Sequence, residues 1–342
     1  MSEALYRKYR PKNFKEVIGQ DHIVSVLTSS IEKGDVAHAY LFAGSRGTGK
    51  TSIARIVARE IGTTDSDLYE IDAASNRGID DVRAIRESVH TLPFESKYKV
   101  YIIDEAHMLT KEAWNAFLKT LEEPPLHVVF IMATTELDKV PDTVLSRCIS
   151  FQFKKPSRTE LRDIVLSSSK KEGVSLEKSS AELIALLGDG SFRDTLGILQ
   201  KVLSFSKDKK ISHEEVRIVT GAPKGSLVDT FIEGLLLKKG NETMNAIKEV
   251  SDSGIDMKLF VSLALEKLRA ILLLRIAPES KVWLKNTFSD EDFIKVIEIA
   301  ENSDAIISSS VILELLSAYE SVGRSSIESL PVELAAAKIL SV

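Results

Sequence analysis

Five short runs of apolar residues lie in the first half of the chain, separated by amphipathic segments. Runs of this length are typical of strands buried on both faces of a parallel sheet. They are Ala39–Ala43, Leu68–Ile71, Lys99–Ile103, His127–Ala133 and Ile149–Phe153. Helical periodicity lies between them at Ile18–Lys33, Lys50–Ile61, Ile79–Thr91 and Lys111–Glu122. This alternation predicts an α/β domain, a five-stranded parallel sheet with helices on both faces.

The pattern changes after Pro156, where the strand signals stop. Helical periodicity then covers Thr159–Glu172, Ser179–Leu187, Ser191–Phe205 and His213–Thr220. Glycine and proline at residues 221–225 predict a hinge, because both interrupt regular structure. Helical patterns resume from Ser226 to the end. We therefore expect three domains: residues 1–156, which hold the sheet, and two all-helical domains, residues 157–222 and 223–342.

The composition is that of a soluble globular protein. Hydrophobic residues make up 44% of the chain and charged residues 28%, as in soluble globular proteins. The chain has no apolar run of 18 or more residues, and its first residues do not resemble a signal peptide. The one cysteine, Cys148, cannot form an intramolecular disulfide. We expect a cytoplasmic protein with no membrane partner.

Charge is unevenly distributed. The net charge of −5 argues against a generally basic surface for nucleic acid. Within residues 1–15, however, five basic side chains accompany the single acidic residue Glu3. Such an arm is either a solvated segment or an element that binds phosphate or docks a subunit.

A phosphate-binding loop follows the first apolar run and begins a helical segment. Its residues are Gly44, Ser45, Arg46, Gly47, Thr48, Gly49, Lys50 and Thr51, with Ser52 next in the helix. Glycines allow backbone amides to turn toward phosphates, and the helix N-terminus adds partial positive charge. We expect Lys50 to contact the β- and γ-phosphates and the Thr51 hydroxyl to bind Mg²⁺. The sequence therefore predicts an ATPase.

Two carboxylates end the third apolar run, at Asp104 and Glu105. Adjacent acids at the end of a buried strand are costly unless a cation or hydrogen bonds compensate them. We expect Asp104 to hold Mg²⁺ and Glu105 to polarise the attacking water as a general base.

Two further segments carry candidate residues that also have an ordinary structural explanation. Thr134 and Thr135 follow the fourth apolar run, where a hydroxyl could orient the water or simply cap a strand. Arg147 lies after a short helix, where a cation is favourable for structural reasons alone.

A third candidate lies at the start of a helix. Ser191 is expected to cap it, with Asp194 in the reciprocal position. Arg193 then lies in the first turn, where the helix dipole disfavours a cation. A nearby anion such as a phosphate of ATP would resolve the conflict, and a solvated arginine is the alternative.

With these residues in hand, the chain resembles the bacterial clamp loader ATPases, the gamma/tau subunits of DNA polymerase III, within the AAA+ family. The resemblance covers residues 5–200. Besides the phosphate loop, it rests on residues 5–11 (LYRKYRP), 17–20 (VIGQ), 38–42 (HAYLF), 70–76 (EIDAASN), 104–109 (DEAHML), 119–125 (KTLEEPP), 133–135 (ATT) and 145–148 (LSRC). It implies an AAA+ core of five strands, a helical lid and an all-α collar that assembles subunits into a five-membered ring.

The resemblance also assigns roles. Thr135 corresponds to the sensor 1 residue, and Arg193 to the sensor 2 arginine that acts on the nucleotide of its own chain. Arg147 corresponds to an arginine finger that acts on ATP bound to the adjacent subunit. The residues implied around adenine and ribose are Tyr9, Arg10, Pro11, Val17 and Ile18.

The implied function is the ATP-dependent loading of a sliding clamp on primer-template DNA, together with other clamp loader subunits. The family usually has a four-cysteine zinc module before residues 70–72, but residues 62–67 here contain no cysteine. We therefore expect ATP and Mg²⁺ but no zinc. The alternatives are a non-hydrolysing structural subunit of the loader and another AAA+ DNA motor, such as a branch-migration ATPase.

Overall fold

The computed structural model describes residues 3–206, 210–285, 287–288 and 290–341. Tertiary contacts divide the chain into two compact units, residues 1–161 with 186–197 and residues 162–185 with 198–342. The predicted α/β domain lies in the first unit. Most of the predicted helical region lies in the second, and its division at residue 222 stays a prediction. Among the described residues, no helix combines the length and apolar content needed to cross a bilayer.

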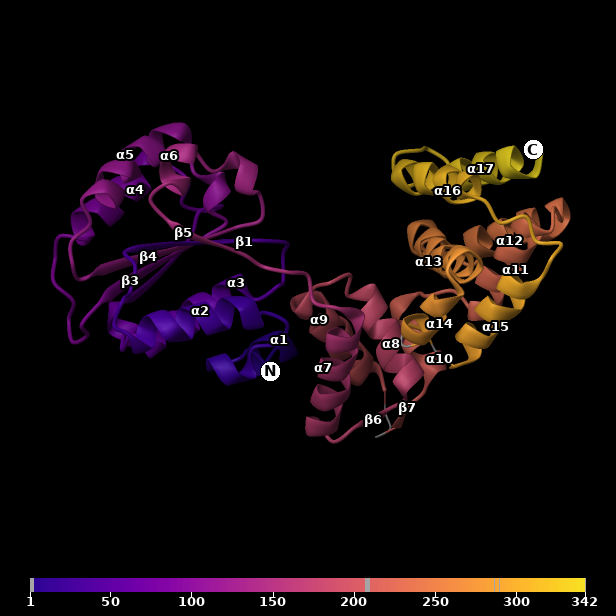
Figure 1. Ribbon diagram of the computed structural model, residues 1–342, viewed down its shortest axis with the longest axis horizontal. Helices are drawn as coiled ribbons and strands as arrows, with labels where there is room; N and C mark the ends of the chain where they lie inside the picture. Colours follow the sequence, from indigo (N-terminus) through magenta and orange to yellow (C-terminus); the bar gives the residue numbers. More distant parts are fainter. Residues whose placement is uncertain (1–2, 207–209, 286, 289, 342) are drawn as a thin grey trace. The chain divides into compact units, whose positions relative to one another are not determined.

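The first unit contains the predicted five-stranded parallel sheet (Figure 1). Its strands are β1 (Ala39–Ala43), β2 (Leu68–Asp72), β3 (Lys99–Asp104), β4 (Val128–Thr134) and β5 (Ile149–Gln152). They lie in the order β2-β3-β4-β1-β5, and every neighbouring pair is parallel. The carboxyl ends of all five strands therefore meet at one edge of the sheet, which is where α/β folds of this kind bind ligands.

Helices cover both faces of this sheet (Figure 1). They are α2 (Asp21–Glu32) and α3 (Lys50–Glu60) on one face, and α4 (Ile79–Ser88), α5 (Lys111–Glu122) and α6 (Asp142–Leu145) on the other. Side chains alternate along each strand: Val100 and Ile102 of β3 pack with α2 and α3, whereas Tyr101 and Ile103 pack with α4 to α6. Burial on both faces explains the continuous apolar runs of the sequence.

Shorter elements complete the first unit. They are α1 (Leu5–Lys8) and the 3₁₀ turns Phe14–Glu16, Asp65–Asp67, Ala106–Met108 and Leu137–Lys139. Helix α5 ends at Glu122, as predicted, because Pro124 and Pro125 cannot continue it.

The rest of the chain is mainly helical. Its helices are α7 (Arg158–Lys171), α8 (Lys178–Leu187), α9 (Phe192–Phe205), α10 (His213–Thr220), α11 (Gly225–Leu236), α12 (Gly240–Asp252), α13 (Met257–Ile276), α14 (Lys281–Leu284), α15 (Asp290–Glu301), α16 (Ser309–Ser321) and α17 (Leu330–Ser341), with a 3₁₀ turn at Pro278–Ser280. Helices α11 to α17 share one apolar core that includes Phe231 and Phe260. The expectation of no strand beyond Pro156 is wrong, because β6 (Ser175–Leu176) pairs in parallel with β7 (Lys210–Ile211). Two residues per strand are too few to produce a sequence pattern.

Candidate functional site

The phosphate loop lies between β1 and α3, as predicted. Gly47 and Gly49 have φ angles of 73° and 102°, a left-handed conformation that glycine adopts without strain. A Cβ on Gly47 would lie 1.9 Å from the Ser191 side-chain oxygen, so this position also requires glycine for space. The Thr48 hydroxyl donates to the Ser45 carbonyl at 2.9 Å and closes the loop. The sequence thus fixes a tight turn directly at the N-terminus of a helix.

Lys50 is buried within this loop. Its Nζ donates hydrogen bonds to the carbonyl oxygens of Gly44 at 2.7 Å and Ser45 at 2.9 Å. Burial lowers the pKa of Lys50, and the negative charges of Glu105 and Asp104 oppose that change. A buried ammonium group beside two carboxylates suits a polyanion such as a triphosphate, to which it can donate in place of the carbonyls.

The predicted magnesium ligands contact each other. The Thr51 hydroxyl donates to Asp104 Oδ2 at 2.8 Å, joining the first turn of α3 to the end of β3. Among the described residues, no group of three or more His, Cys, Asp or Glu side chains could hold a metal ion alone. One hydroxyl and one carboxylate nevertheless fit Mg²⁺, which keeps several waters and takes further oxygens from a nucleotide.

Glu105 has an unusual backbone conformation. Its φ of 49° and ψ of 42° are left-handed, which costs a non-glycine residue about 1–3 kcal/mol. Thr135 Oγ1 donates to Glu105 Oε2 at 3.3 Å, and the carboxylate remains about one-third exposed. Strain and partial exposure at the end of a buried strand are features of a group that acts on a ligand.

His107 is a neighbour of Glu105 that the sequence analysis missed. Its side chain is only 7% exposed, and its Nδ1 lies 3.1 Å from Thr134 Oγ1 and 3.6 Å from Glu105 Oε2. Its Nε2 lies 3.3 Å from Glu136 Oε1. The imidazole thus connects the two segments that carry Glu105 and Thr135. Its position two residues after Glu105, within the same turn, was the available signal.

Arg193 reaches the same region from the start of α9. The Ser191 hydroxyl accepts from the Asp194 amide at 3.2 Å, which confirms the expected cap on that side. The Phe192 amide donates to the Gly47 carbonyl at 3.0 Å and so attaches this helix to the phosphate loop. The Arg193 guanidinium lies over the Tyr6 ring at 5.5 Å.

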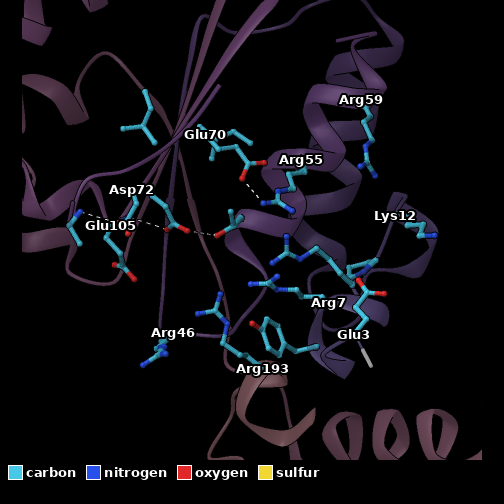
Figure 2. Close-up of a pocket in the computed structure, with 18 residues that line it drawn as sticks. Glu3, Arg7, Lys12, Arg46, Arg55, Arg59, Glu70, Asp72, Glu105 and Arg193 are labelled. Carbon is cyan, nitrogen blue, oxygen red and sulfur yellow. Dashed lines mark hydrogen bonds and ion pairs between the residues drawn. The ribbon is translucent and has the colours of Figure 1, made fainter. Parts of the chain in front are cut away.

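A cavity of about 900 Å³ is lined by most of the charged side chains described above (Figure 2). Its lining includes Arg46, Thr51, Asp104, Glu105 and Arg193, together with the predicted adenine-site residues Arg10 and Pro11. Tyr9, Val17 and Ile18 do not line it; Val17 packs against the core beneath α2 and α3, and Ile18 is 39% exposed. The contacts of these five residues with adenine and ribose stay a prediction.

Arg147 lies elsewhere. Its Nη1 donates to the Thr143 carbonyl at 2.6 Å, and its Nη2 pairs with Glu122 Oε1 at 2.7 Å. It lines a second cavity of about 530 Å³, with residues that include His38, Ala39 and Ile149 at the amino ends of β1 and β5. Arg147 is therefore the one predicted catalytic residue that the structure does not bring to the phosphate loop.

Comparisons with known proteins agree with this architecture. A family model described as "DNA polymerase III, delta subunit" matches residues 62–157. The motor protein RuvB of Thermotoga maritima superposes with a TM-score of 0.54 at 23% identity, over 67% of this chain and 79% of that one. At this identity the likeness concerns the fold alone.

Sequence relatives are more informative. The chain is 38% identical over 317 residues to DNA polymerase III subunit tau of Bacillus subtilis, which covers 86% of this chain and 56% of that protein. It is 35% identical over 299 residues to DNA polymerase III subunit gamma of Buchnera aphidicola, covering 81% and 80%. The chain spans about half the length of the first curated relatives it matches, at 56% and 52%. These similarities show that the chain belongs to the gamma/tau family of DNA polymerase III subunits.

Proposed function

We propose that this chain is an ATP-dependent clamp loader subunit, which couples ATP binding and hydrolysis to placing a ring-shaped clamp on primer-template DNA. The observation that carries the proposal is the bond between Thr51 and Asp104 beside Glu105, in a cavity that Arg193 also lines. A purely structural subunit has no use for this combination of groups. We infer the two partners, a clamp and primer-template DNA, and the cytoplasmic location from membership of the gamma/tau family.

Binding of the triphosphate would use the loop and the lysine within it. The amides of residues 44–51 and the N-terminus of α3 stabilise phosphate oxygens, and Lys50 exchanges its carbonyl partners for them. Thr51 and Asp104 are the residues that would hold Mg²⁺, which neutralises charge on the phosphate oxygens when bound.

Hydrolysis would then require a base and cations around the terminal phosphate. Glu105 would accept a proton from the attacking water, whose oxygen bonds to the γ-phosphorus while the bond to the bridging oxygen of ADP breaks. Thr135 and His107 hold the Glu105 carboxylate through the contacts described above. Arg193 would stabilise charge on the transferred group from the same chain, and Arg147 from the neighbouring subunit of a five-membered ring.

A branch-migration ATPase is the competing function from the same fold. The likeness to RuvB concerns architecture, whereas the polymerase subunits match at 35–38% identity over more than four-fifths of the chain. We therefore favour the clamp loader.

The proposal is tested by ATP hydrolysis in the assembled loader, with and without primed DNA and clamp. We expect hydrolysis that primed DNA and clamp together stimulate, and we expect it to be lost in Lys50→Ala. Hydrolysis stimulated by four-way junction DNA instead would favour branch migration. Absence of hydrolysis, with ATP still bound, would favour the structural subunit.

A further inference from the structure

The large cavity holds more positive charge than the predicted phosphate site explains. Seven basic side chains line it: Arg7, Arg10, Lys12, Arg46, Arg55, Arg59 and Arg193. Its acidic lining is Glu3, Glu70, Asp72, Asp104 and Glu105. Figure 2 shows Arg7 and Arg55 beside this cavity, together with Arg193. Arg7 and Arg55 have no part in the contacts of the phosphate loop described above.

Arg55 lies on the same face of α3 as Thr51, four residues further along, at a rise of about 6 Å. It pairs with Glu70 of the edge strand β2, but its Nε is buried without a hydrogen-bond partner. A buried donor left unpaired destabilises the folded chain unless a ligand satisfies it. This position therefore has an unused donor next to the predicted magnesium ligand.

Arg7 and Arg10 approach the same place from the N-terminal arm. Arg7 lies over the Tyr6 ring at 5.7 Å, and within the described residues neither arginine forms an ion pair. Burial lowers the pKa of Arg10, and the nearby charges of Arg55, Arg193 and Arg7 lower it further, while Glu70 opposes them. Arg7, Arg10 and Arg55 are therefore close enough to repel each other, and an anion would relieve that repulsion.

We propose that Arg7 and Arg55 form a second oxyanion subsite, which receives the inorganic phosphate that ATP hydrolysis releases. The inference rests on the proposed function. Cleavage leaves two anions, ADP and phosphate, which repel each other. One continuous cavity connects Thr51, Asp104 and Glu105 with Arg7 and Arg55, so the phosphate can move toward these two arginines while ADP stays on the loop. Guanidinium groups match the oxygens of a small dianion with paired donors.

The first experiment measures binding of inorganic phosphate to the full chain saturated with ADP and Mg²⁺, by equilibrium dialysis with labelled phosphate. We expect saturable binding that weakens about tenfold or more in Arg7→Gln and in Arg55→Gln, since one charge-assisted hydrogen bond accounts for that much. Arg83→Gln is the control, because Arg83 is exposed on α4 and pairs with Asp80 outside the cavity. Melting curves of each variant establish that it is folded.

The second experiment compares, in a single turnover, the cleavage of ATP with the appearance of free phosphate at a fluorescent phosphate sensor. We expect a delay between the two in the wild type and in Arg83→Gln, and a shorter delay in Arg7→Gln. Equal phosphate affinity in all variants, or slower cleavage with unchanged phosphate binding, would overturn the subsite. A chain that binds phosphate beside ADP but hydrolyses no ATP would retain the subsite and overturn the proposed function.

Discussion

The two edges of the five-stranded sheet hold their polar groups in different ways. At the carboxyl edge, the Asp104 carboxylate accepts hydrogen bonds, within the described residues, only from the Thr51 hydroxyl and the adjacent Glu105 amide. Glu105 has a strained backbone and is partly exposed, and Arg55 has an unpaired buried donor nearby. Charges at this edge are incompletely satisfied within the chain.

At the amino edge, the buried side chains of Asp67 and Lys99 form hydrogen bonds within the chain. Asp67, just before β2, accepts hydrogen bonds from the backbone amides of Phe94, Glu95 and Ser96. Lys99, the first residue of β3, donates to the Ser88 carbonyl and to the Thr91 hydroxyl at 2.8 and 2.7 Å. Such groups stabilise the fold and require no ligand.

A ligand is therefore needed at the carboxyl edge, whereas Arg147 lies at the amino edge. This residue comes just before β5, and Tyr40 of β1 pairs with Ile149 of β5. The phosphate loop begins beyond the opposite end of β1, about 13 Å away for a strand of five residues. Arg147 thus lies at the edge away from the phosphate site of its own chain, which supports action on a neighbouring subunit.

Arg147→Ala tests whether this arginine acts on a neighbouring subunit. ATP should bind normally to the altered chain, while hydrolysis in the assembled complex falls by about 10³-fold or more, the range for arginine fingers. Mixing Arg147→Ala with Lys50→Ala chains in one assembly should restore part of the activity, because an intact loop can then meet an intact arginine. Weaker ATP binding by Arg147→Ala alone would place the residue in its own site.

Glu105→Gln tests the carboxyl edge. The amide keeps the shape of the side chain but cannot accept the proton, so hydrolysis should slow by about 10²–10⁴-fold while ATP still binds. Single-turnover hydrolysis and nucleotide affinity measured together check this. Turnover of Glu105→Gln at the wild-type rate would show that Glu105 has a structural role, as the polar groups of the amino edge do.

The sheet could be predicted from the sequence because its strands are buried on both faces. Three of the five predicted strands differ from the structure by one residue at one end, His127–Ala133 differs by one residue at each end, and Ala39–Ala43 is identical. The phosphate loop and Asp104 could be placed for a related reason, since a buried strand fixes where its last residue lies. β6 and β7 leave no comparable pattern.

Other residues of the site depend on contacts between distant segments. Arg55 and Arg59 follow Thr51 at helical spacing, but only the approach of α1 and β2 makes them part of a cavity. The grouping of residues 186–197 with the sheet likewise arises from tertiary contacts, such as that between Phe192 and Gly47. Periodicity within one segment cannot reveal such contacts.

Glu122→Gln tests whether the ion pair at the amino edge orients Arg147. Glu122 ends α5, where the helix dipole disfavours a carboxylate, and its ion pair with Arg147 offsets that cost. Losing one charge-assisted hydrogen bond should leave Arg147 less well oriented and slow hydrolysis in the assembly about tenfold. Glu123→Gln, at the exposed next residue, is the matched control. An equal further loss in the Arg147→Ala background would show that Glu122 acts independently of Arg147.

Asp67→Asn should have the smallest effect on hydrolysis, although it acts on a buried group. Burial by itself would raise the pKa of Asp67, but the three amide hydrogen bonds outweigh it and lower the pKa to about 2. An aspartate in the unfolded chain titrates near 3.8. The ionised form therefore stabilises the fold fully above pH 4, and this contribution is lost as the pH falls toward 2.

Asparagine at position 67 keeps one acceptor oxygen and adds a donor that faces the amides. We expect about 2 kcal/mol of lost stability near neutral pH, with ATP affinity unchanged. Urea unfolding at several pH values should show the difference between wild type and variant shrinking below pH 4. A difference that does not vary with pH would mean that the Asp67 charge is not what holds residues 94–96 at this edge.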